Sequence, residues 1–160
     1  MSVHLQRSID IQAPLGFVFE QSNQLDQWPQ MIPEYLSVEV IRCEGHKVWF
    51  RLTNANEDSW VSWRMFAPPV LAYAERLDPM GPFEFNQITW TYAPTPGGMT
   101  IMTWDMFFSL KEEIRVQEQI WAERMAEHVE ANQAHMKLWL EARAPVSWSP
   151  ELLIRAEDHV

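Results

Sequence analysis

One stretch of the chain combines residue types that could bind a reactive oxygen atom. In residues 59–66, strand alternation would place four side chains on one face, namely Trp60, Ser62, Arg64 and Phe66. An arginine stays protonated in proteins, so Arg64 cannot act as a general base but can donate hydrogen bonds. Arginine is rarely fully buried without a partner. The stretch is therefore either an exposed sheet edge or the wall of an internal cavity that holds one cation.

Composition suggests a cavity but does not require one. The chain of 160 residues contains nine Trp and nine Met. Tryptophan supplies flat apolar area and methionine fills irregular space, so together they suit a site for a planar or flexible apolar ligand. A core that is simply rich in tryptophan explains the same composition.

Charge and cysteine content exclude several classes of protein. The net charge of −10 argues against a general role in binding nucleic acids or anionic membranes. Cys43 is the only cysteine, so no disulfide framework or cysteine metal site is expected. No N-terminal targeting segment or long apolar run is apparent, and we expect a cytoplasmic protein.

The candidate residues lie on a simple order of elements. Period-two patterns predict seven strands, over residues 3–12, 35–43, 47–53, 59–66, 70–77, 85–92 and 99–110. Two short helices are predicted over residues 14–23 and 25–31, and one long helix over 112–143. Residues 144–160 form a C-terminal tail to this single domain.

This order predicts an α+β helix-grip fold. A curved antiparallel sheet of six to seven strands can bury itself and the long C-terminal helix by wrapping around that helix. The two short helices would follow the first strand. Such an arrangement leaves an interior cavity between the concave face of the sheet and the helix.

Several segments also match a known family in their order and spacing. They are Asp26-Gln27-Trp28-Pro29 with Glu34-Tyr35, Trp60-Val61-Ser62-Trp63-Arg64, Gly81-Pro82-Phe83, Thr89-Trp90-Thr91-Tyr92, and Trp104. With these segments, residues 3–143 resemble the single-domain aromatase/cyclases of bacterial type II polyketide synthases. That family belongs to the START and birch-allergen-like superfamily.

The resemblance implies a reaction and its partners. A linear poly-β-ketone tethered to an acyl carrier protein would fold in the cavity, where an intramolecular aldol condensation closes the first ring and loss of water makes it aromatic. The implied partners are the acyl carrier protein and the ketosynthase/chain-length factor of the synthase, with the chain a monomer or homodimer. No metal, nucleotide or redox cofactor is implied. Because such carriers are acidic, docking requires a basic patch, to which Lys47, Lys111 and Arg115 could contribute.

Two residues are the candidates for catalysis. Arg64 could donate to the ketone or enolate oxygen, an interaction that is strong in a dry site. Tyr35 could relay a proton, with a pKa that positive neighbours would lower. The competing interpretations are a surface ion pair for Arg64 and a structural hydroxyl for Tyr35.

The remaining candidates are expected to bind and shape the substrate. They are Trp28, Trp60, Ser62, Phe66, Phe83, Trp90, Met102, Trp104, His128 and Asn132. Simple core packing is the alternative for each tryptophan. His128 and His135 lie seven residues apart without an acidic residue at zinc-ligand spacing, so a metal site is not expected.

Two other functions fit the same fold. A carrier for a lipid, quinone or polyketide would use a similar cavity without chemistry, and an assembly subunit of the synthase would shape the complex without turnover. Arg64 together with Tyr35 and Ser62 favours the enzyme, because a lipid carrier gains little from an internal arginine.

Overall fold

The computed structural model describes residues 2–145. It contains the strands β1 (Val3–Ile11), β2 (Tyr35–Glu44), β3 (Lys47–Asn54), β4 (Ser59–Ala67), β5 (Leu71–Arg76), β6 (Phe83–Pro94) and β7 (Thr100–Leu110). The helices are α1 (Leu15–Ser22), α2 (Trp28–Met31) and α3 (Glu118–Arg143), with short 3-10 segments η1 (Leu25–Gln27) and η2 (Glu112–Gln117). The predicted order is confirmed, although the first turns of the long helix are 3-10. The predicted tail lies outside the described residues, apart from Ala144 and Pro145.

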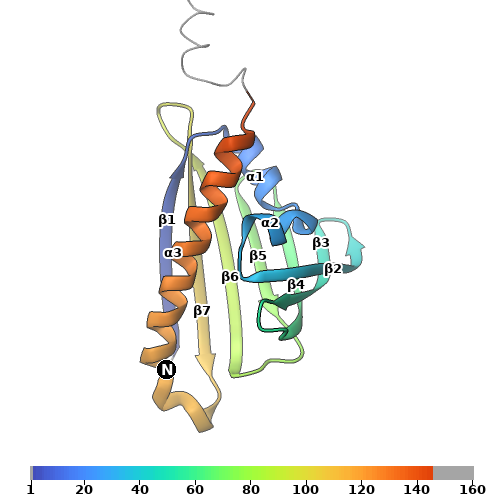
Figure 1. The fold of residues 1–160 in the computed structure, drawn as a ribbon, viewed down its shortest axis with the longest axis vertical. Helices are drawn as coiled ribbons and strands as arrows, with labels where there is room; N and C mark the ends of the chain where they lie inside the picture. Colours follow the sequence, from blue (N-terminus) through green and yellow to red (C-terminus); the bar gives the residue numbers. More distant parts are fainter. Residues whose placement is uncertain (1, 146–160) are drawn as a thin grey trace, which may run out of the picture.

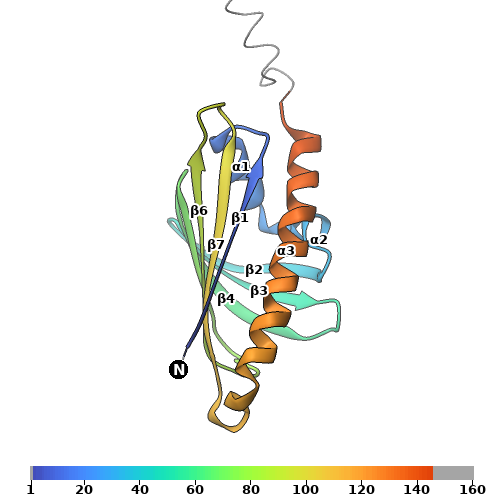
Figure 2. The ribbon, with the colours of Figure 1, turned by 90° about the vertical axis from the view of Figure 1, so that its left-hand side faces the viewer.

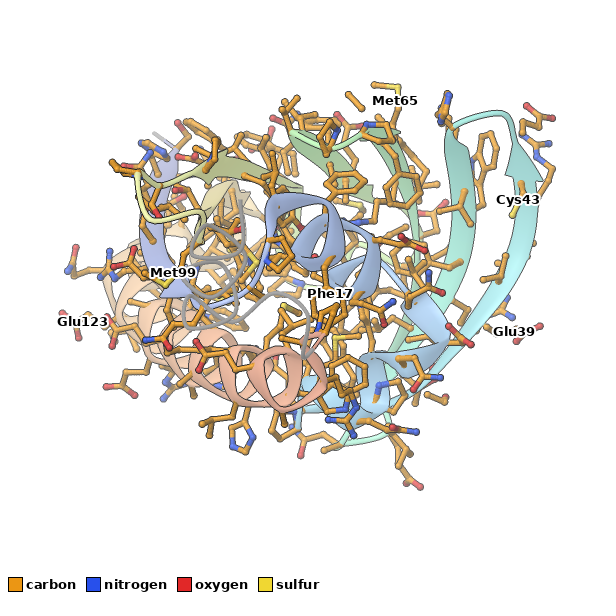
Figure 3. The ribbon with its side chains drawn as sticks, turned by 90° about the horizontal axis from the view of Figure 1, so that it is seen from above. Phe17, Glu39, Cys43, Met65, Met99 and Glu123 are labelled. Carbon is orange, nitrogen blue, oxygen red and sulfur yellow. The ribbon has the colours of Figure 1, made fainter. Side chains whose placement is uncertain are left out.

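All seven strands form one antiparallel sheet in the order β1-β7-β6-β5-β4-β3-β2. Strands β2 to β7 are a meander, and β1 returns to pair with β7, with Val3 opposite Phe108 and Ile11 opposite Thr100. Seen from above, the sheet curves around the interior and α3 lies across its open side (Figure 3). This is the predicted helix-grip arrangement.

The turn between β2 and β3 shows how the chain makes its hairpins. It consists of Gly45 and His46, and Gly45 has a φ of 56°. A two-residue hairpin turn needs a positive φ, which glycine adopts without steric cost. The strands on either side therefore pair closely, with Glu44 opposite Lys47.

Helix α3 runs along the sheet for most of its length (Figure 2). Its buried side chains are Val129, Asn132, Gln133, Met136 and Leu140. Polar contacts fix the helix to β1: Arg7 pairs with Glu130 at 2.9 Å, and the Gln133 amide donates to the Arg7 carbonyl at 3.0 Å. Lys137 also donates to the carbonyl oxygen of Asp10.

The interior is packed at one end only. Around α1 and the C-terminal half of α3, side chains such as Val18, Met102, Met136 and Leu140 are completely buried and form a continuous core. The N-terminal half of α3 instead faces a hollow in the sheet. The fold therefore uses α1 and half of α3 for stability and leaves the other half free for a site.

Strand β4 lies between β3 and β5, so the stretch that contains Arg64 is not a sheet edge. Ser62 and Arg64 are buried on the concave face, whereas Met65 is exposed and points away from the interior (Figure 3). The cavity-wall alternative is thus correct. Among residues 2–145, no helix is both long and apolar enough to cross a membrane.

Candidate active site

A cavity of about 690 Å³ lies between the concave face of the sheet and the N-terminal half of α3. Its lining residues come from strands β1 to β7 and from α2 and α3, the elements labelled in Figure 1. The residues around its opening are exposed and belong to the 54–58 turn, the 79–81 loop and α3, namely Ala55, Asn56, Asp58, Pro79, Gly81, Arg124 and His128. A volume of this size is typical of sites for small organic molecules.

Arg64 is a buried cation in the wall of this cavity. The side chain is 2% exposed, and it makes no ion pair with any residue between 2 and 145. Its guanidinium carbon lies 4.2 Å from the ring centroid of Trp90 and 5.2 Å from that of Trp28, so the charge is held by aromatic faces. Burial lowers the pKa of Arg64 to about 10, and the nearby Tyr92 and Tyr35 oppose this shift. Arg64 therefore remains protonated at neutral pH.

Asn23, the residue that ends α1, fixes the direction of Arg64. Its Oδ1 accepts hydrogen bonds from Nε and Nη2 of Arg64 at 3.0 and 2.9 Å. Its Nδ2 donates to the Phe19 carbonyl at 2.8 Å and to the Tyr92 hydroxyl at 3.1 Å. The Tyr92 hydroxyl also contacts Ser22 Oγ at 2.7 Å. Because both ends of the amide are engaged, Asn23 cannot rotate without breaking four contacts.

This arrangement leaves part of the guanidinium free. An arginine carries five N–H donors, and Arg64 uses two of them on Asn23. Its Nη1 has no hydrogen-bonding partner among residues 2–145, and Arg64 lines the cavity. The site thus offers an oriented, charged donor to an oxygen atom of a ligand.

Further polar side chains line the cavity without a hydrogen bond to any described residue, among them Tyr35, Ser62, Asn86 and Asn132. Ser62 and Asn132 are both 7% exposed, and they come from opposite walls, β4 and α3. An apolar cavity with a few convergent polar groups is the usual construction of a ligand site. These groups can therefore position oxygen atoms of a ligand relative to Arg64.

The pKa of Tyr35 is raised, not lowered as predicted. Burial raises the pKa of its phenol, the charge of Glu34 raises it further, and Arg64 opposes both effects. The expectation that positive neighbours lower this pKa is wrong in its net direction, because loss of hydration outweighs the charge of Arg64. Tyr35 is thus a neutral phenol, which can donate a hydrogen bond to a ligand.

The tryptophans form flat walls around Arg64. Trp90 and Trp104 are opposite each other on β6 and β7 and stack with ring centroids 4.2 Å apart and parallel planes. The ring centroid of Trp28 lies 5.8 Å from that of Trp90, and Nε1 of Trp28 donates to the Ser22 carbonyl at 2.9 Å. Trp60 and Phe83 line the cavity closer to the opening. The rings thus give the cavity flat aromatic walls.

His128 lines the opening, not the deep cavity. Its side chain is 60% exposed, and its Nδ1 lies 2.5 Å from Glu34 Oε2. The pair joins α3 to the residue that precedes β2, across the mouth. His128 therefore occupies the rim of the predicted binding site.

Two predicted binding residues, Phe66 and Met102, do not line the cavity. Phe66 lies on the same face of β4 as Arg64 but further along, where it borders a separate small hollow beside α1. Met102 is completely buried in the packed end of the interior, opposite Ile9 and Tyr92. Alternation correctly gives their face, but it does not show where along the strand the cavity ends.

Two important residues were not predicted, Asn23 and Arg76. Asn23 comes from a helix end and reaches Arg64 only through the tertiary fold, so no local pattern signals it. Arg76 ends β5 and lines the cavity. Its position in alternation with Ala72 and Ala74, which are both buried, could have placed it on the inner face.

The three lysine and arginine residues suggested for docking lie elsewhere. Lys47, Lys111 and Arg115 do not line the cavity. Lys47 lies over the rings of Trp49 and Trp63, and Arg115 pairs with Glu84 at 2.8 Å. The basic residues around the opening are Arg76 and Arg124. Among residues 2–145, no three His, Cys, Asp or Glu side chains are grouped to hold a metal ion.

Comparison with solved structures supports the fold. Over 92% of this chain and 98% of the other, the structure is similar to the Zhui aromatase/cyclase from Streptomyces sp. R1128, with a TM-score of 0.80 and 16% sequence identity. The di-domain aromatase/cyclase StfQ from the steffimycin pathway matches with a TM-score of 0.78 and 13% identity, over 89% of this chain and 52% of that one. The present chain therefore spans about half the length of StfQ.

Sequence comparison identifies the family. Two proteins, from Streptomyces cyaneus and Streptomyces halstedii, are named "Putative polyketide cyclase" and are 37% and 38% identical to this chain. The first match covers 74% of this chain and 80% of its relative, and the second covers 65% and 99%. Residues 2–141 match the family described as polyketide cyclase / dehydrase and lipid transport. The chain therefore belongs to this family of polyketide cyclases, dehydrases and lipid-transport proteins.

Proposed function

We propose that the chain is a polyketide aromatase/cyclase that directs aldol closure and dehydration of the first ring of a poly-β-ketone. The observation that carries this proposal is Arg64, a buried cation that lines the cavity and has no carboxylate partner among residues 2–145. Family membership and the polyketide cyclase names of the two Streptomyces relatives support it.

The first step is carbon–carbon bond formation. A methylene between two carbonyls of the substrate is already acidic, so it loses a proton to water or buffer without a strong base. The resulting enolate carbon attacks a ketone carbon of the same chain, and that ketone oxygen takes up the electron pair. Arg64 donates to this oxygen and stabilises its developing charge, which an oriented donor in a dry site does by a few kcal/mol. The oxygen then accepts a proton to give a tertiary alcohol.

The second step is loss of one water molecule. The carbon next to the alcohol loses a proton, a carbon–carbon double bond forms, and the hydroxyl leaves with a proton as water. Tyr35 supplies the proton to the leaving hydroxyl as a general acid, and burial keeps its phenol protonated until then. It regains a proton from the carbon acid, so the enzyme ends unchanged.

Ring choice comes from the shape of the cavity. The flat walls of Trp28, Trp90 and Trp104 hold the folded chain in a single plane. Ser62 and Asn132 offer further polar contacts from opposite walls. Holding two parts of one flexible chain in reactive geometry lowers the barrier by several kcal/mol.

The proposed partners follow from the substrate. A poly-β-ketone of this type is carried by an acyl carrier protein and made by a ketosynthase/chain-length factor. We therefore propose that the carrier protein presents the chain at the opening formed by the 54–58 turn, the 79–81 loop and α3. Arg124, which is exposed at this opening, offers one positive charge to an acidic carrier.

The test is reconstitution with a minimal synthase that makes the linear chain. Wild type should raise the share of product with an aromatised first ring, and Arg64→Gln should return the products to those of the synthase alone. Arg51→Gln is the matched control, because Arg51 is an exposed arginine that pairs with Glu39 outside the cavity. Thermal unfolding shows whether each variant is folded. If wild type leaves the product pattern unchanged, the cyclase proposal fails.

A carrier function is the second candidate, and the apolar cavity and the family description, which includes lipid transport, favour it. A carrier holds a ligand without converting it. Native mass spectrometry after incubation with the synthase products separates the two: a carrier retains unmodified chain, whereas a cyclase releases a product lighter by one water.

A further inference from the structure

We propose that Arg76 is a second anchor, which binds the carbonyl oxygen at the acyl end of the substrate near the mouth of the cavity. The proposal rests on the proposed cyclase function and adds a specificity residue to it. Arg64 would then hold the oxygen at the site of ring closure, and Arg76 would hold the end that remains tethered.

The two arginines share one wall. In the register of β4 and β5, Arg64 is opposite Ala74 and Ser62 is opposite Arg76. These four residues form a square on the sheet, with the arginines on one diagonal and the small residues Ser62 and Ala74 on the other. Residues on such a diagonal are about 7–8 Å apart at the backbone. Both pairs line the cavity. The small residues leave room for a ligand between the two cations.

The two guanidinium groups point to different ends of the cavity. Arg64 lies against Trp90 and Trp28 in the interior. Arg76 lies 4.4 Å from the ring centroid of Trp60 and 5.4 Å from that of Phe83, beside the 79–81 loop. A ligand that contacts both must therefore carry oxygen atoms at separated positions, as a poly-β-ketone does.

Arg76 is held in place by the loop that follows it. Its Nε donates to the carbonyl oxygen of Pro79 at 2.9 Å. Gly81 has a φ of 60°, and a Cβ there would lie 2.8 Å from Arg76 Nη2. The loop thus adopts a glycine-specific conformation at the point where the guanidinium approaches it.

The terminal nitrogens of Arg76 remain available. Apart from the bond to Pro79, Arg76 makes no hydrogen bond or ion pair with any residue between 2 and 145, although Asp58 is close enough to influence it electrostatically. A structural arginine at a surface usually pairs with a carboxylate. Here the aromatic rings and one carbonyl hold the group, and its two terminal nitrogens have no acceptor in the part of the chain that the structure describes.

The position of Arg76 suggests which oxygen it binds. A chain attached to a carrier protein enters free end first, because the carrier itself is too large for a cavity of about 690 Å³. The thioester carbonyl is therefore the last oxygen to enter and lies closest to the mouth. Arg76 is the hydrogen-bond donor on the cavity wall at the depth of this carbonyl. It lies at the end of β5, beside the exposed Pro79 and Gly81.

A matched pair of probes tests this assignment. S-(2-naphthoyl)pantetheine carries a thioester carbonyl, and S-(2-naphthylmethyl)pantetheine has the same ring and tether without that carbonyl. Calorimetry should show that wild type prefers the thioester by about tenfold, the effect of one hydrogen bond to a charged donor. Arg76→Gln should abolish the preference, and the control Arg51→Gln should keep it.

A second variant moves the guanidinium without removing the charge. Gly81→Ala should reduce the preference because its Cβ would meet Arg76 Nη2, and it provides the test if Arg76→Gln does not fold. The anchor is overturned if the preference persists in both variants, or if both probes weaken equally, which indicates a packing role beside Trp60. Absence of any binding by wild type counts against the anchor and the cyclase function together. If wild type binds the probes and its preference for the thioester is unchanged in Arg76→Gln and Gly81→Ala, the anchor alone is overturned.

Discussion

At the scale of single residues, the chemistry depends on how a buried charge is supported. Asn23 supplies one acceptor oxygen to two N–H groups of Arg64, and no carboxylate takes part. A carboxylate in that place would also accept hydrogen bonds from Arg64, but it could not donate to the Phe19 carbonyl, and it would cancel the charge that a developing oxyanion needs. The neutral amide therefore supports Arg64 without competing with the substrate.

This role of Asn23 gives a first prediction. Asn23→Ala should lower the free energy of unfolding by about 1–3 kcal/mol, because two buried donors lose their acceptor. Asn23→Asp should lose most of the first-ring aromatised product, because the new carboxylate neutralises Arg64, and it should also lose stability, because a carboxylate cannot donate to the Phe19 carbonyl. Urea denaturation and product analysis measure the two effects, and Arg51→Gln, outside the cavity, serves as the control. Full cyclase activity in Asn23→Asp would show that the charge of Arg64 is not used.

Tyr35 gives a second prediction, on pH. An unfolded tyrosine ionises near pH 10, whereas burial raises the pKa of folded Tyr35 well above that value. The folded chain then keeps a proton that the unfolded chain releases, so this contribution to stability is complete below about pH 10 and is lost as the pH rises further. Tyr35→Phe lacks the ionisation.

The measurement is urea denaturation of wild type and Tyr35→Phe at pH 7, 9 and 10.5. The difference in unfolding free energy should stay constant from pH 7 to 9, and wild type should lose more stability than the variant at pH 10.5. The raised pKa values of Tyr73 and Tyr92 affect both proteins equally. Parallel curves across the whole range would contradict the assignment.

At the scale of elements, α3 has two different duties. Met136 in its C-terminal half is completely buried in the core, whereas Met125 in its N-terminal half lines the cavity and is partly exposed. One helix thus stabilises the fold with one end and forms the site with the other.

The two methionines form a matched pair for a third prediction. Met136→Ala should cost about 2–5 kcal/mol of unfolding free energy, since it opens a hole in a packed core. Met125→Ala should cost about 1 kcal/mol or less, because it enlarges a space that already exists. The second variant should instead change the proportions of the cyclised products. Equal losses of stability would show that the N-terminal half of α3 is packed as tightly as the other half.

The elements also show what the sequence could and could not predict. Period-two alternation correctly predicted seven strands and the inner face of β4, because burial on one face of a sheet imposes that pattern. Alternation could not predict how far along each strand the cavity extends. Phe66 and Met102 were therefore assigned to the cavity, although both lie beyond its end. Alternation also could not predict that Asn23 contacts Arg64, because that contact joins residues 41 positions apart.

At the scale of the whole molecule, the fold holds an empty space without losing its core. The core around α1 and the end of α3 is continuous and fully buried, and the cavity lies beside it. A ligand that binds in the cavity of the folded chain, and not to the unfolded chain, should therefore add stability. A ligand at 100 times its dissociation constant adds about 2.7 kcal/mol.

Filling the cavity should remove this gain while leaving the fold intact. Ala74 is opposite Arg64 on the cavity wall and is 7% exposed, so a larger side chain there would occupy the ligand space. Ala74→Phe should melt at or above the temperature of wild type, and S-(2-naphthoyl)pantetheine should no longer raise that temperature. Ala67→Phe is the control, because Ala67 is exposed and lies outside the cavity lining. A ligand-dependent rise that survives in Ala74→Phe would place the ligand elsewhere, whereas a lower melting temperature without ligand would show that Ala74 packs against side chains and not against open space.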